Sequence, residues 1–216
     1  MGYKAAIFDM DGTILDTLED LTDSVNAALR WAGYPERTLD EVRSFVGNGA
    51  LKLVERAVPA GTGAADIRRV LDFYRPYYQE HAEEKTRPYP GIPEALSALR
   101  AAGVKLAVVS NKPHGATVKL AARYFPGAFD AVLGARDGVP VKPAPDLLEA
   151  VMGSLGAAPE ETAYIGDSDV DIETAKNTGT ACVSVAWGFR SEGFLREHGA
   201  DLTVRNGEEL LAALLA

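Results

Sequence analysis

Apolar and polar residues follow two different rhythms along this chain of 216 residues. Residues 3–8 form a short apolar run, which is typical of a buried parallel strand. Through residues 17–83 the apolar positions recur every three or four residues, as at Leu18, Leu21 and Val25. That spacing gives one apolar stripe per helix and predicts a block of helices. From about residue 88 onward, strand-length apolar runs alternate with helical stretches.

Local signals indicate where the helices of this block begin and end. Residues 38–41, Thr-Leu-Asp-Glu, form a capping-box sequence that opens a helix. Two glycine-containing triplets, residues 47–49 and 61–63, interrupt the helical pattern. We therefore expect several short helices rather than one long one.

The second part of the chain predicts strands that alternate with helices. We expect strands at residues 104–109, 131–133, 162–165 and 181–186. We expect helices at residues 92–102 and 143–155, helices ending near residues 124 and 177, and a last helix at 208–215. This alternation favours βαβ units, hence an α/β fold built on a parallel sheet.

The helical block interrupts this sheet domain directly after its first strand. The sequence thus predicts a core of residues 1–16 and 84–216 and an inserted helical module of residues 17–83. The linkers are expected near residues 16–17 and 83–85. A module inserted there can fold over the strand ends and act as a lid.

Composition is that of an ordinary soluble globular protein, with 47% apolar and 25% charged residues. No apolar run approaches the ~20 residues of a membrane-spanning helix, and the first residues lack the pattern of a secretory signal. We therefore expect a cytoplasmic protein without a membrane partner. The single cysteine, Cys182, lies in an apolar run and is expected to be a buried, unreactive thiol.

The formal net charge of −9 argues against nucleic acid as a ligand, because no basic stripe is present to replace counterions. The same charge repels any anionic substrate from the molecule as a whole. Such a substrate must therefore be attracted by local cations at its site.

Polar residues gather where four of the predicted strands or loops end. These positions are Asp9 with Asp11, Ser110 with Asn111, Lys142, and Asp167 with Asp171. Parallel strands place their carboxyl ends at one edge of the sheet, so these residues can converge in space. Two acids separated by one residue are unfavourable there unless a cation or a shared proton compensates them.

Such a set of residues suits phosphoryl transfer. A carboxylate can attack phosphorus and form an aspartyl-phosphate, while Mg²⁺ and a lysine neutralise the developing charge. Asp9 and Asp167 fit the metal, and Lys142 fits the point charge. The Ser110 hydroxyl and nearby N–H groups can take phosphoryl oxygens, and Asp11 can move protons.

Four segments resemble the motifs of the haloacid dehalogenase superfamily, in the same order. They are residues 9–13 (Asp-Met-Asp-Gly-Thr), 110–113 (Ser-Asn-Lys-Pro), 142–146 (Lys-Pro-Ala-Pro-Asp) and 166–171 (Gly-Asp-Ser-Asp-Val-Asp). The resemblance implies a Rossmann-like core with a C1-type α-helical cap.

The resemblance also implies a role for each motif residue. Asp9 is the nucleophile, Asp11 the general acid and base, and Lys142 the residue that orients nucleophile and phosphate. Asp9, the Asp11 backbone carbonyl and Asp167 bind Mg²⁺, and Asp171 supports the metal or its water shell. The substrate-binding residues of these motifs are Ser110, Asn111, Gly12 and Thr13.

Asp11 separates the chemistries of that superfamily. Halide departs without a proton, and true dehalogenases resemble this pattern without the second aspartate. A poor alkoxide leaving group needs the acid. The sequence therefore favours a phosphatase or a phosphomutase.

The inserted block also resembles the cap segment of phosphoglycolate phosphatases, at residues 45–49 and 53–57. Residues 110–113 and 186–189 are similar to that family as well. On this resemblance Gly47, Asn48, Gly49 and Arg56 are candidates for binding the substrate's small carboxylate. The competing interpretation is a helix-breaking corner with Arg56 merely exposed.

The sequence analysis therefore predicts an Mg²⁺-dependent phosphatase, with 2-phosphoglycolate as substrate. Alternatives are a phosphatase for a sugar phosphate or pyrophosphate, a phosphomutase of the β-phosphoglucomutase type and, more distantly, a non-catalytic phosphoacceptor or regulatory protein. The expected partner is a small phosphate ester, and the expected state is a monomer or a homodimer.

Overall fold

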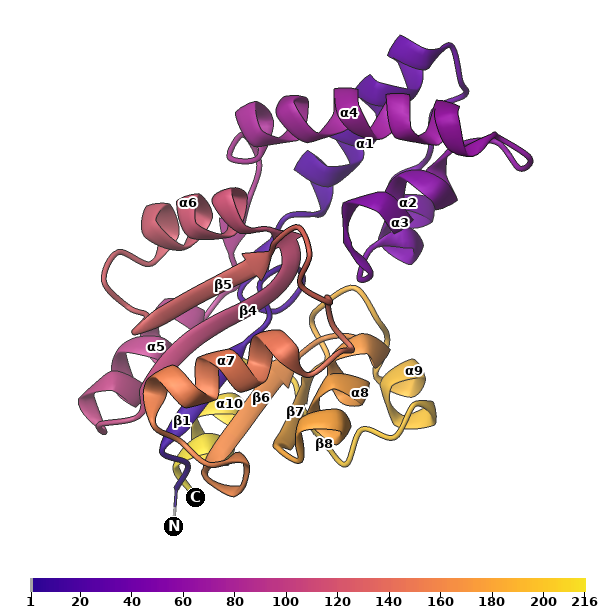
Figure 1. Cartoon of the computed structure of the whole chain (residues 1–216). Coiled ribbons are helices and arrows are strands. Elements are labelled where there is room, and N and C mark those ends of the chain that lie inside the picture. Colours follow the sequence, from indigo (N-terminus) through magenta and orange to yellow (C-terminus); the bar gives the residue numbers. More distant parts are fainter. Residues whose placement is uncertain (1) are drawn as a thin grey trace.

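The computed structural model describes residues 2–216 and contains a six-stranded parallel sheet at its centre (Figure 1). The strand order is β5-β4-β1-β6-β7-β8. Their bounds are β1 (Ala5–Phe8), β4 (Lys105–Pro113), β5 (Ala131–Ala135), β6 (Thr162–Gly166), β7 (Ala181–Val185) and β8 (Leu202–Val204). The predicted α/β fold with a Rossmann-like parallel sheet is confirmed, and β1 lies between β4 and β6.

Helices cover both faces of the sheet because successive strand residues point to opposite sides. Phe8 packs with α5 (Ile92–Ala101), α6 (His114–Tyr124) and α10 (Gly207–Leu215). Its neighbour Ile7 packs on the other face with α7 (Asp146–Leu155) and α8 (Asp169–Thr178). A short 3₁₀ helix η1 (Pro159–Glu161) precedes β6, and α9 (Glu192–Glu197) precedes β8.

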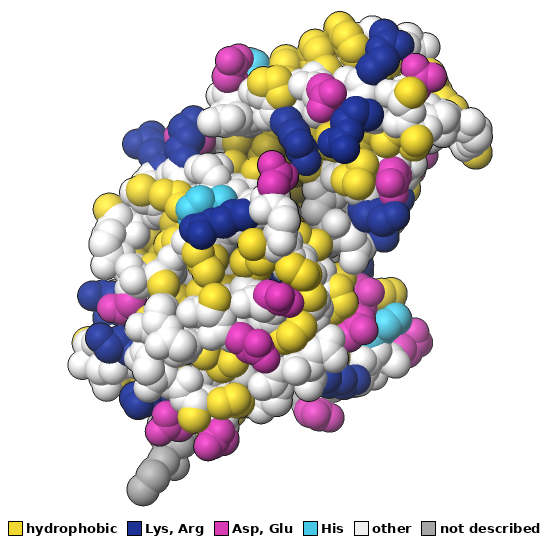
Figure 2. Space-filling view, viewed as in Figure 1, with side chains coloured by type: hydrophobic (Ala, Val, Ile, Leu, Met, Phe, Trp, Pro, Cys, Tyr) yellow, Lys and Arg dark blue, Asp and Glu magenta, His cyan; other side chains and the backbone are white. Residues whose placement is uncertain are grey.

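The chain between the first two strands of this sheet forms a separate helical lobe (Figure 1). It contains α1 (Leu18–Ala32), α2 (Leu39–Phe45), α3 (Gly49–Ala57) and α4 (Ala64–His81). The lobe has an apolar core of its own, built around Leu29, Val54 and Leu71. We call it the cap and propose it as the inserted module of residues 17–83. The space-filling view shows a notch in the outline where cap and sheet lobe meet (Figure 2).

The chain enters and leaves the cap through a small two-stranded connection. Strand β2 (Leu15–Asp16) pairs antiparallel with β3 (Arg87–Pro88). Arg87 lies 2.8 Å from the Asp16 carboxylate. The buried Asp20 of α1 accepts hydrogen bonds from the backbone N–H groups of Lys85 and Thr86. The two crossings are therefore held side by side at the base of the cap.

Several element boundaries differ from the prediction. Strand β4 continues to Pro113, beyond its apolar run, because Pro113 still pairs with Ala135 of β5. Helix α7 begins at Asp146, so residues 143–145 lie outside it rather than in its first turn. The prediction missed β2, β3, β8 and α9, which are short and have no clear apolar period.

Two further expectations concern exposure. Cys182 is partly rather than fully buried, and burial raises the pKa of its thiol to about 12, which keeps it unreactive. Within residues 2–216, the structure contains no helix that combines the length and the apolar character needed to cross a membrane.

Candidate active site

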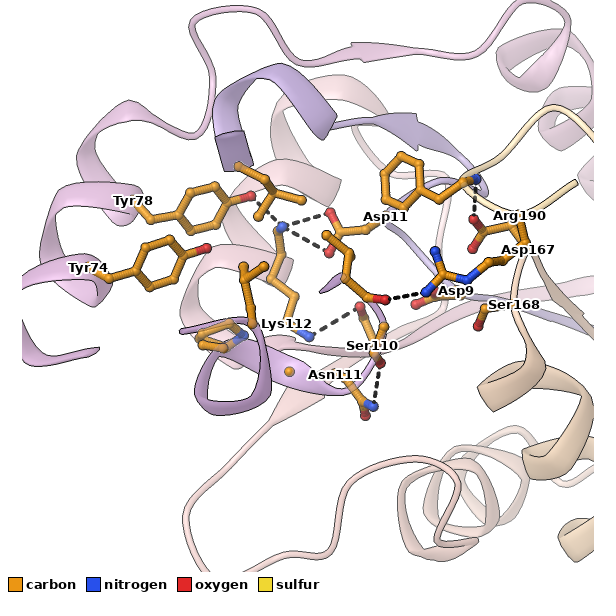
Figure 3. Close-up of a pocket in the computed structure, with 18 residues that line it drawn as sticks. Asp9, Asp11, Tyr74, Tyr78, Ser110, Asn111, Lys112, Asp167, Ser168 and Arg190 are labelled. Atoms are coloured by element: carbon orange, nitrogen blue, oxygen red, sulfur yellow. Dashed lines mark hydrogen bonds and ion pairs between the residues drawn. The ribbon is translucent and has the colours of Figure 1, made fainter. Parts of the chain in front are cut away.

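A pocket lies between the carboxyl edge of the sheet and the cap, and it brings together most of the predicted site residues (Figure 3). Asp9 and Asp11 follow β1, and Asp167 follows β6. Ser110 and Asn111 reach the pocket from β4. The parallel topology thus places residues from distant parts of the sequence at one edge of the sheet, as the sequence predicts.

The acidic side chains form a buried cluster. Oxygens of Asp9, Asp167 and Asp171 lie within 4.8 Å of one another, and all three residues are buried. Burial raises the pKa of Asp9, Lys142 lowers it, and the charges of Asp171 and Asp11 raise it, which gives a net value of about 6. Burial and the charges of Asp171 and Asp9 raise the pKa of Asp167 well above its usual value. Negative charges this close together repel one another, so the three carboxylates are favourable only with a cation beside them.

The Asp167 carboxylate is held tightly against the backbone around it. Its Oδ2 accepts a 2.6 Å hydrogen bond from the N–H of Phe189. A Cβ placed on Gly12 would lie 2.3 Å from the same oxygen, and one on Gly188 would lie 2.3 Å from the Asp167 Cβ. Both positions therefore require glycine, and together they fix the direction in which Asp167 points.

Lys142 lies behind Asp9, in a buried polar network. Its Nζ lies 3.0 Å from Asp9 Oδ1 and donates to Asp171 Oδ1 at 2.7 Å and to the Tyr164 hydroxyl at 2.8 Å. Asp171 Oδ2 accepts from the backbone and hydroxyl groups of Ser168, at 3.1 and 2.6 Å. Both oxygens of Asp171 are thus engaged, and its geometry suits holding Lys142 rather than binding a metal directly.

A metal fits the two remaining acids. Asp9 Oδ1 is a buried oxygen for which the described residues provide no well-aligned hydrogen bond, although the Lys142 ammonium is near. An orphaned carboxylate oxygen beside a second raised-pKa carboxylate is a hard oxygen donor set of the kind that Mg²⁺ prefers. Asp9 and Asp167 therefore could hold a divalent cation.

Asp11 points to the other side of the pocket, toward the cap. Its Oδ1 accepts from the Thr17 hydroxyl at 2.7 Å and from Lys112 Nζ at 2.7 Å, while Oδ2 lies 3.0 Å from the same nitrogen. The two acids of the first motif therefore occupy different electrostatic surroundings. That separation suits two different roles in proton and phosphoryl transfer.

The remaining predicted residues lie in three places: at the cap side of the pocket, behind Asp167, and in a neighbouring groove. Gly47 and Gly49 line the pocket from the cap, and the Gly47 carbonyl accepts a 3.0 Å hydrogen bond from Asn111. Gly12 and Thr13 lie behind Asp167 instead of lining the pocket.

Asn48 and Arg56 face a neighbouring open groove. There Arg56 donates to the Phe45 carbonyl at 2.6 Å and to Asn48 Oδ1 at 2.8 Å. The structure therefore does not bring Arg56 into the pocket.

Sequence reasoning missed Lys112, Tyr74 and Tyr78 as pocket residues, and Arg190 also lines the pocket. Arg190 follows β7 and donates to the carbonyls of Arg43 and Val46 in the cap, both at 2.7 Å. Lys112 had a usable signal, because it directly follows Ser110 and Asn111 in the second motif. The two tyrosines had none, since their spacing on α4 is that of ordinary helix packing.

Comparison with known proteins gives consistent results. The profile of the family described as "Haloacid dehalogenase-like hydrolase" matches residues 6–185. The chain is similar to a phosphoglycolate phosphatase of Pseudomonas syringae pv. tomato, with 34% identity over 98% of this chain and 80% of the relative. An N-acetylmuramic acid 6-phosphate phosphatase of Pseudomonas aeruginosa is 35% identical over 99% of this chain and 96% of its own length.

A similar fold is found in a crystal structure from Lactobacillus delbrueckii subsp. bulgaricus, described as a proposed phosphoglycolate phosphatase. It superimposes with a TM-score of 0.95 and 41% identity, and the match covers 100% of both chains.

Proposed function

The chain belongs to the haloacid dehalogenase-like hydrolases, and on this premise we propose that it is an Mg²⁺-dependent phosphatase acting on a small phosphate monoester, 2-phosphoglycolate. The observation that carries the proposal is the meeting of Asp9, Asp11, Ser110 and Asp167 in one pocket, with Lys142 directly behind Asp9.

The first chemical step is proposed to be attack by a carboxylate oxygen of Asp9 on phosphorus. An Asp9 oxygen–phosphorus bond forms while the bond from phosphorus to the leaving oxygen breaks. The proton of Asp11 goes to that leaving oxygen, so that glycolate departs as an alcohol. Lys142 stays ammonium because the charges of Asp171 and Asp9 raise its pKa against the effect of burial, and it attracts the phosphoryl oxygens.

The second step returns the enzyme to its starting state. Asp11, now a carboxylate, takes a proton from water, whose oxygen attacks phosphorus. The bond from phosphorus to Asp9 breaks and phosphate leaves. Asp9, Asp167 and the Asp11 carbonyl are the groups proposed to hold Mg²⁺, which supplies positive charge for the phosphoryl oxygens when bound. The Ser110 hydroxyl completes the phosphate site, and the Asn111 side chain supports it by donating to the carbonyls of Gly47 and Lys142.

Mg²⁺ is expected to stabilise the protein more at neutral than at acidic pH. The pKa values of Asp9 and Asp167 are raised in the folded, metal-free protein, to about 6 for Asp9. Because the folded state holds these protons more tightly than the unfolded state, the free energy of unfolding falls as they are lost. The protonated carboxyls stabilise the fold fully below the unfolded-state pKa of 3.8, and this contribution is lost as the pH rises through about 6. A cation binds the deprotonated forms, so it restores stability where the protein alone has lost it.

Thermal unfolding in EDTA and in saturating MgCl₂ measures this effect. At about pH 7.5 we expect Mg²⁺ to raise the Tm by about 5 to 10 °C. At about pH 5 we expect less than half of that rise. Asp167→Asn should remove most of the effect, whereas Asp66→Asn, on an exposed face of the cap, should keep it. Equal rises at both pH values would contradict the assignment of the metal to these acids.

The substrate is proposed from the relatives and from the size of the pocket. The cavity between the cap and the sheet lobe has a volume of about 50 Å³, which is room for roughly four waters at about 10–15 Å³ each. That space suits a leaving group of a few atoms and is small for an amino sugar such as N-acetylmuramic acid. A two-carbon acid therefore fits better than the larger substrate named for the Pseudomonas aeruginosa relative.

A panel of phosphate esters tests the substrate assignment. We expect kcat/KM for 2-phosphoglycolate to exceed that for hexose phosphates, pyrophosphate and N-acetylmuramic acid 6-phosphate by about 100-fold or more. A hexose 1-phosphate that is converted to its 6-phosphate would instead identify a phosphomutase. If 2-phosphoglycolate ranks low while another ester is turned over efficiently, the substrate is wrong and the mechanism stands.

A further inference from the structure

Lys112 is a buried cation that the mechanism above does not use. Its side chain is only 2% exposed. Its Nζ contacts both oxygens of Asp11, at 2.7 and 3.0 Å, and donates to the hydroxyl of Tyr78 in the cap. The ammonium thus lies where cap and sheet lobe meet, on the Asp11 side of the pocket (Figure 3).

Two tyrosine hydroxyls accompany this cation. Tyr74 and Tyr78 are one helical turn apart on α4, and their rings stack with centroids 5.6 Å apart and planes 5° apart. Both rings are buried, and both side chains line the pocket. Tyr78 accepts from Lys112, so its own O–H remains to donate. Among the residues that the structure describes, neither O–H group has an acceptor, and an O–H placed at a pocket without one is suited to a ligand oxygen.

Both hydroxyls remain protonated donors at neutral pH. Burial and the neighbouring Tyr78 raise the pKa of Tyr74 well above its usual value. Burial and the charge of Asp11 do the same for Tyr78. The three groups together therefore offer a positive charge and two O–H donors at one wall of the pocket, which is the complement of a carboxylate.

The distances place this wall at the leaving group. Asp11 must come within about 2.8 Å of the ester oxygen to protonate it. Lys112 lies 2.7 Å from Asp11, so its Nζ is within about 6 Å of that ester oxygen. A carboxylate one carbon away from the ester oxygen spans most of this gap.

Lys112 is the positive pocket residue that lies on the Asp11 side. Among the residues that line the pocket, the positive ones are Lys112 and Arg190. The Arg190 guanidinium donates to the carbonyls of Arg43 and Val46 and lies on the Asp167 side in Figure 3. Without Lys112, no positive charge would face a substrate carboxylate on this side of the pocket.

We propose that Lys112, Tyr74 and Tyr78 form the receptor for a carboxylate on the leaving group, and that they select phosphate esters of short 2-hydroxy acids. This inference rests on the proposed phosphatase function of the same pocket. The cap contributes the two hydroxyls and the sheet lobe contributes the charge. The receptor is therefore complete only when the cap lies against the sheet, which couples recognition of the leaving group to closure.

Two substrates that differ only in the carboxylate test the receptor. They are 2-phosphoglycolate and 2-hydroxyethyl phosphate, in which a neutral CH₂OH replaces the carboxylate. For Lys112→Met we expect the ratio of their kcat/KM values to fall by about 10- to 100-fold, chiefly through KM for 2-phosphoglycolate. Tyr74→Phe, which leaves Lys112 in place, should lower the ratio by about 3- to 10-fold.

The ratio separates recognition from other effects of the substitution. Loss of the ion pair between Lys112 and Asp11 can slow both substrates alike, and this cancels in the ratio. Lys105→Met is the matched control: it lies on the same strand at the opposite end and is 54% exposed. We expect it to leave both constants unchanged.

The outcomes distinguish failure of the receptor from failure of the proposed function. Ratios that stay within about threefold of the wild type in both Lys112→Met and Tyr74→Phe overturn the receptor. So does a wild-type enzyme that hydrolyses both esters equally well. A wild-type protein that hydrolyses no phosphate ester overturns the proposed function instead. If Lys112→Met does not fold, Tyr74→Phe alone decides.

Discussion

Asp9→Asn is expected to lower kcat for 2-phosphoglycolate by about 10⁴-fold or more, with the fold retained. An amide oxygen is a far weaker nucleophile than a carboxylate, and in the proposed mechanism no other side chain of the protein forms a bond to phosphorus. The side chain keeps its size, so the pocket keeps its shape.

The same substitution should not reduce the stability of the protein, so a loss of turnover cannot be attributed to unfolding. Burial raises the pKa of Asp9 to about 6, so at neutral pH the folded protein holds an unfavourable negative charge there. Asparagine removes that charge. Lys142 keeps its 2.7 Å contact with Asp171. In EDTA we therefore expect a Tm equal to or above that of the wild type.

Asp11→Asn provides the matched comparison for this variant. It keeps the nucleophile and loses the proton donor, so with p-nitrophenyl phosphate, whose leaving group needs no proton, it should still form the aspartyl-phosphate. Mass spectrometry of acid-quenched protein should find one phosphoryl group on the peptide that contains Asp9, and none in Asp9→Asn. Normal hydrolysis by Asp9→Asn would refute the mechanism.

The fold and much of the candidate active site could be predicted from local patterns. Short apolar runs define β1 and β6, and polar residues directly after them mark one edge of a parallel sheet. Asp9, Asp11 and Asp167 lie in the pocket for that reason. The capping box at Thr38 is equally local: Thr38 and Glu41 bond each other's backbone at 3.3 and 2.8 Å, as predicted.

The meeting of Lys112 with Tyr74 and Tyr78 could not be predicted, because it depends on where the cap lies. Lys112 and Tyr78 are 34 positions apart in the sequence and meet only when α4 lies over the end of β4. A lysine after a strand is normally solvated, and a buried tyrosine on a helix normally packs. Arg56 is the reverse case. Resemblance selected it as a substrate-binding residue of the cap, but it faces a neighbouring groove.

Lys142→Met is expected to impair both stability and turnover. Lys142 and Asp171 have side chains only 2% and 1% exposed, and their charged atoms lie 2.7 Å apart. Removing the cation leaves Asp171 and Asp9 without compensation in the interior, which costs about 3–5 kcal/mol when one partner of a buried pair is lost. The phosphoryl group also loses its point charge, so kcat/KM should fall by about 10³-fold.

The loss of stability should depend on pH in a defined direction. Lys142 lowers the pKa of Asp9, so its removal raises that pKa above about 6. The variant is then least stable at pH values above it, where Asp9 is charged, and recovers toward about pH 5, where Asp9 holds a proton. Urea unfolding at the two pH values measures the difference, with Lys105→Met as the exposed control. A variant with wild-type stability at neutral pH and kcat/KM within about tenfold of the wild type would mean that Lys142 neither compensates these acids nor acts on phosphate.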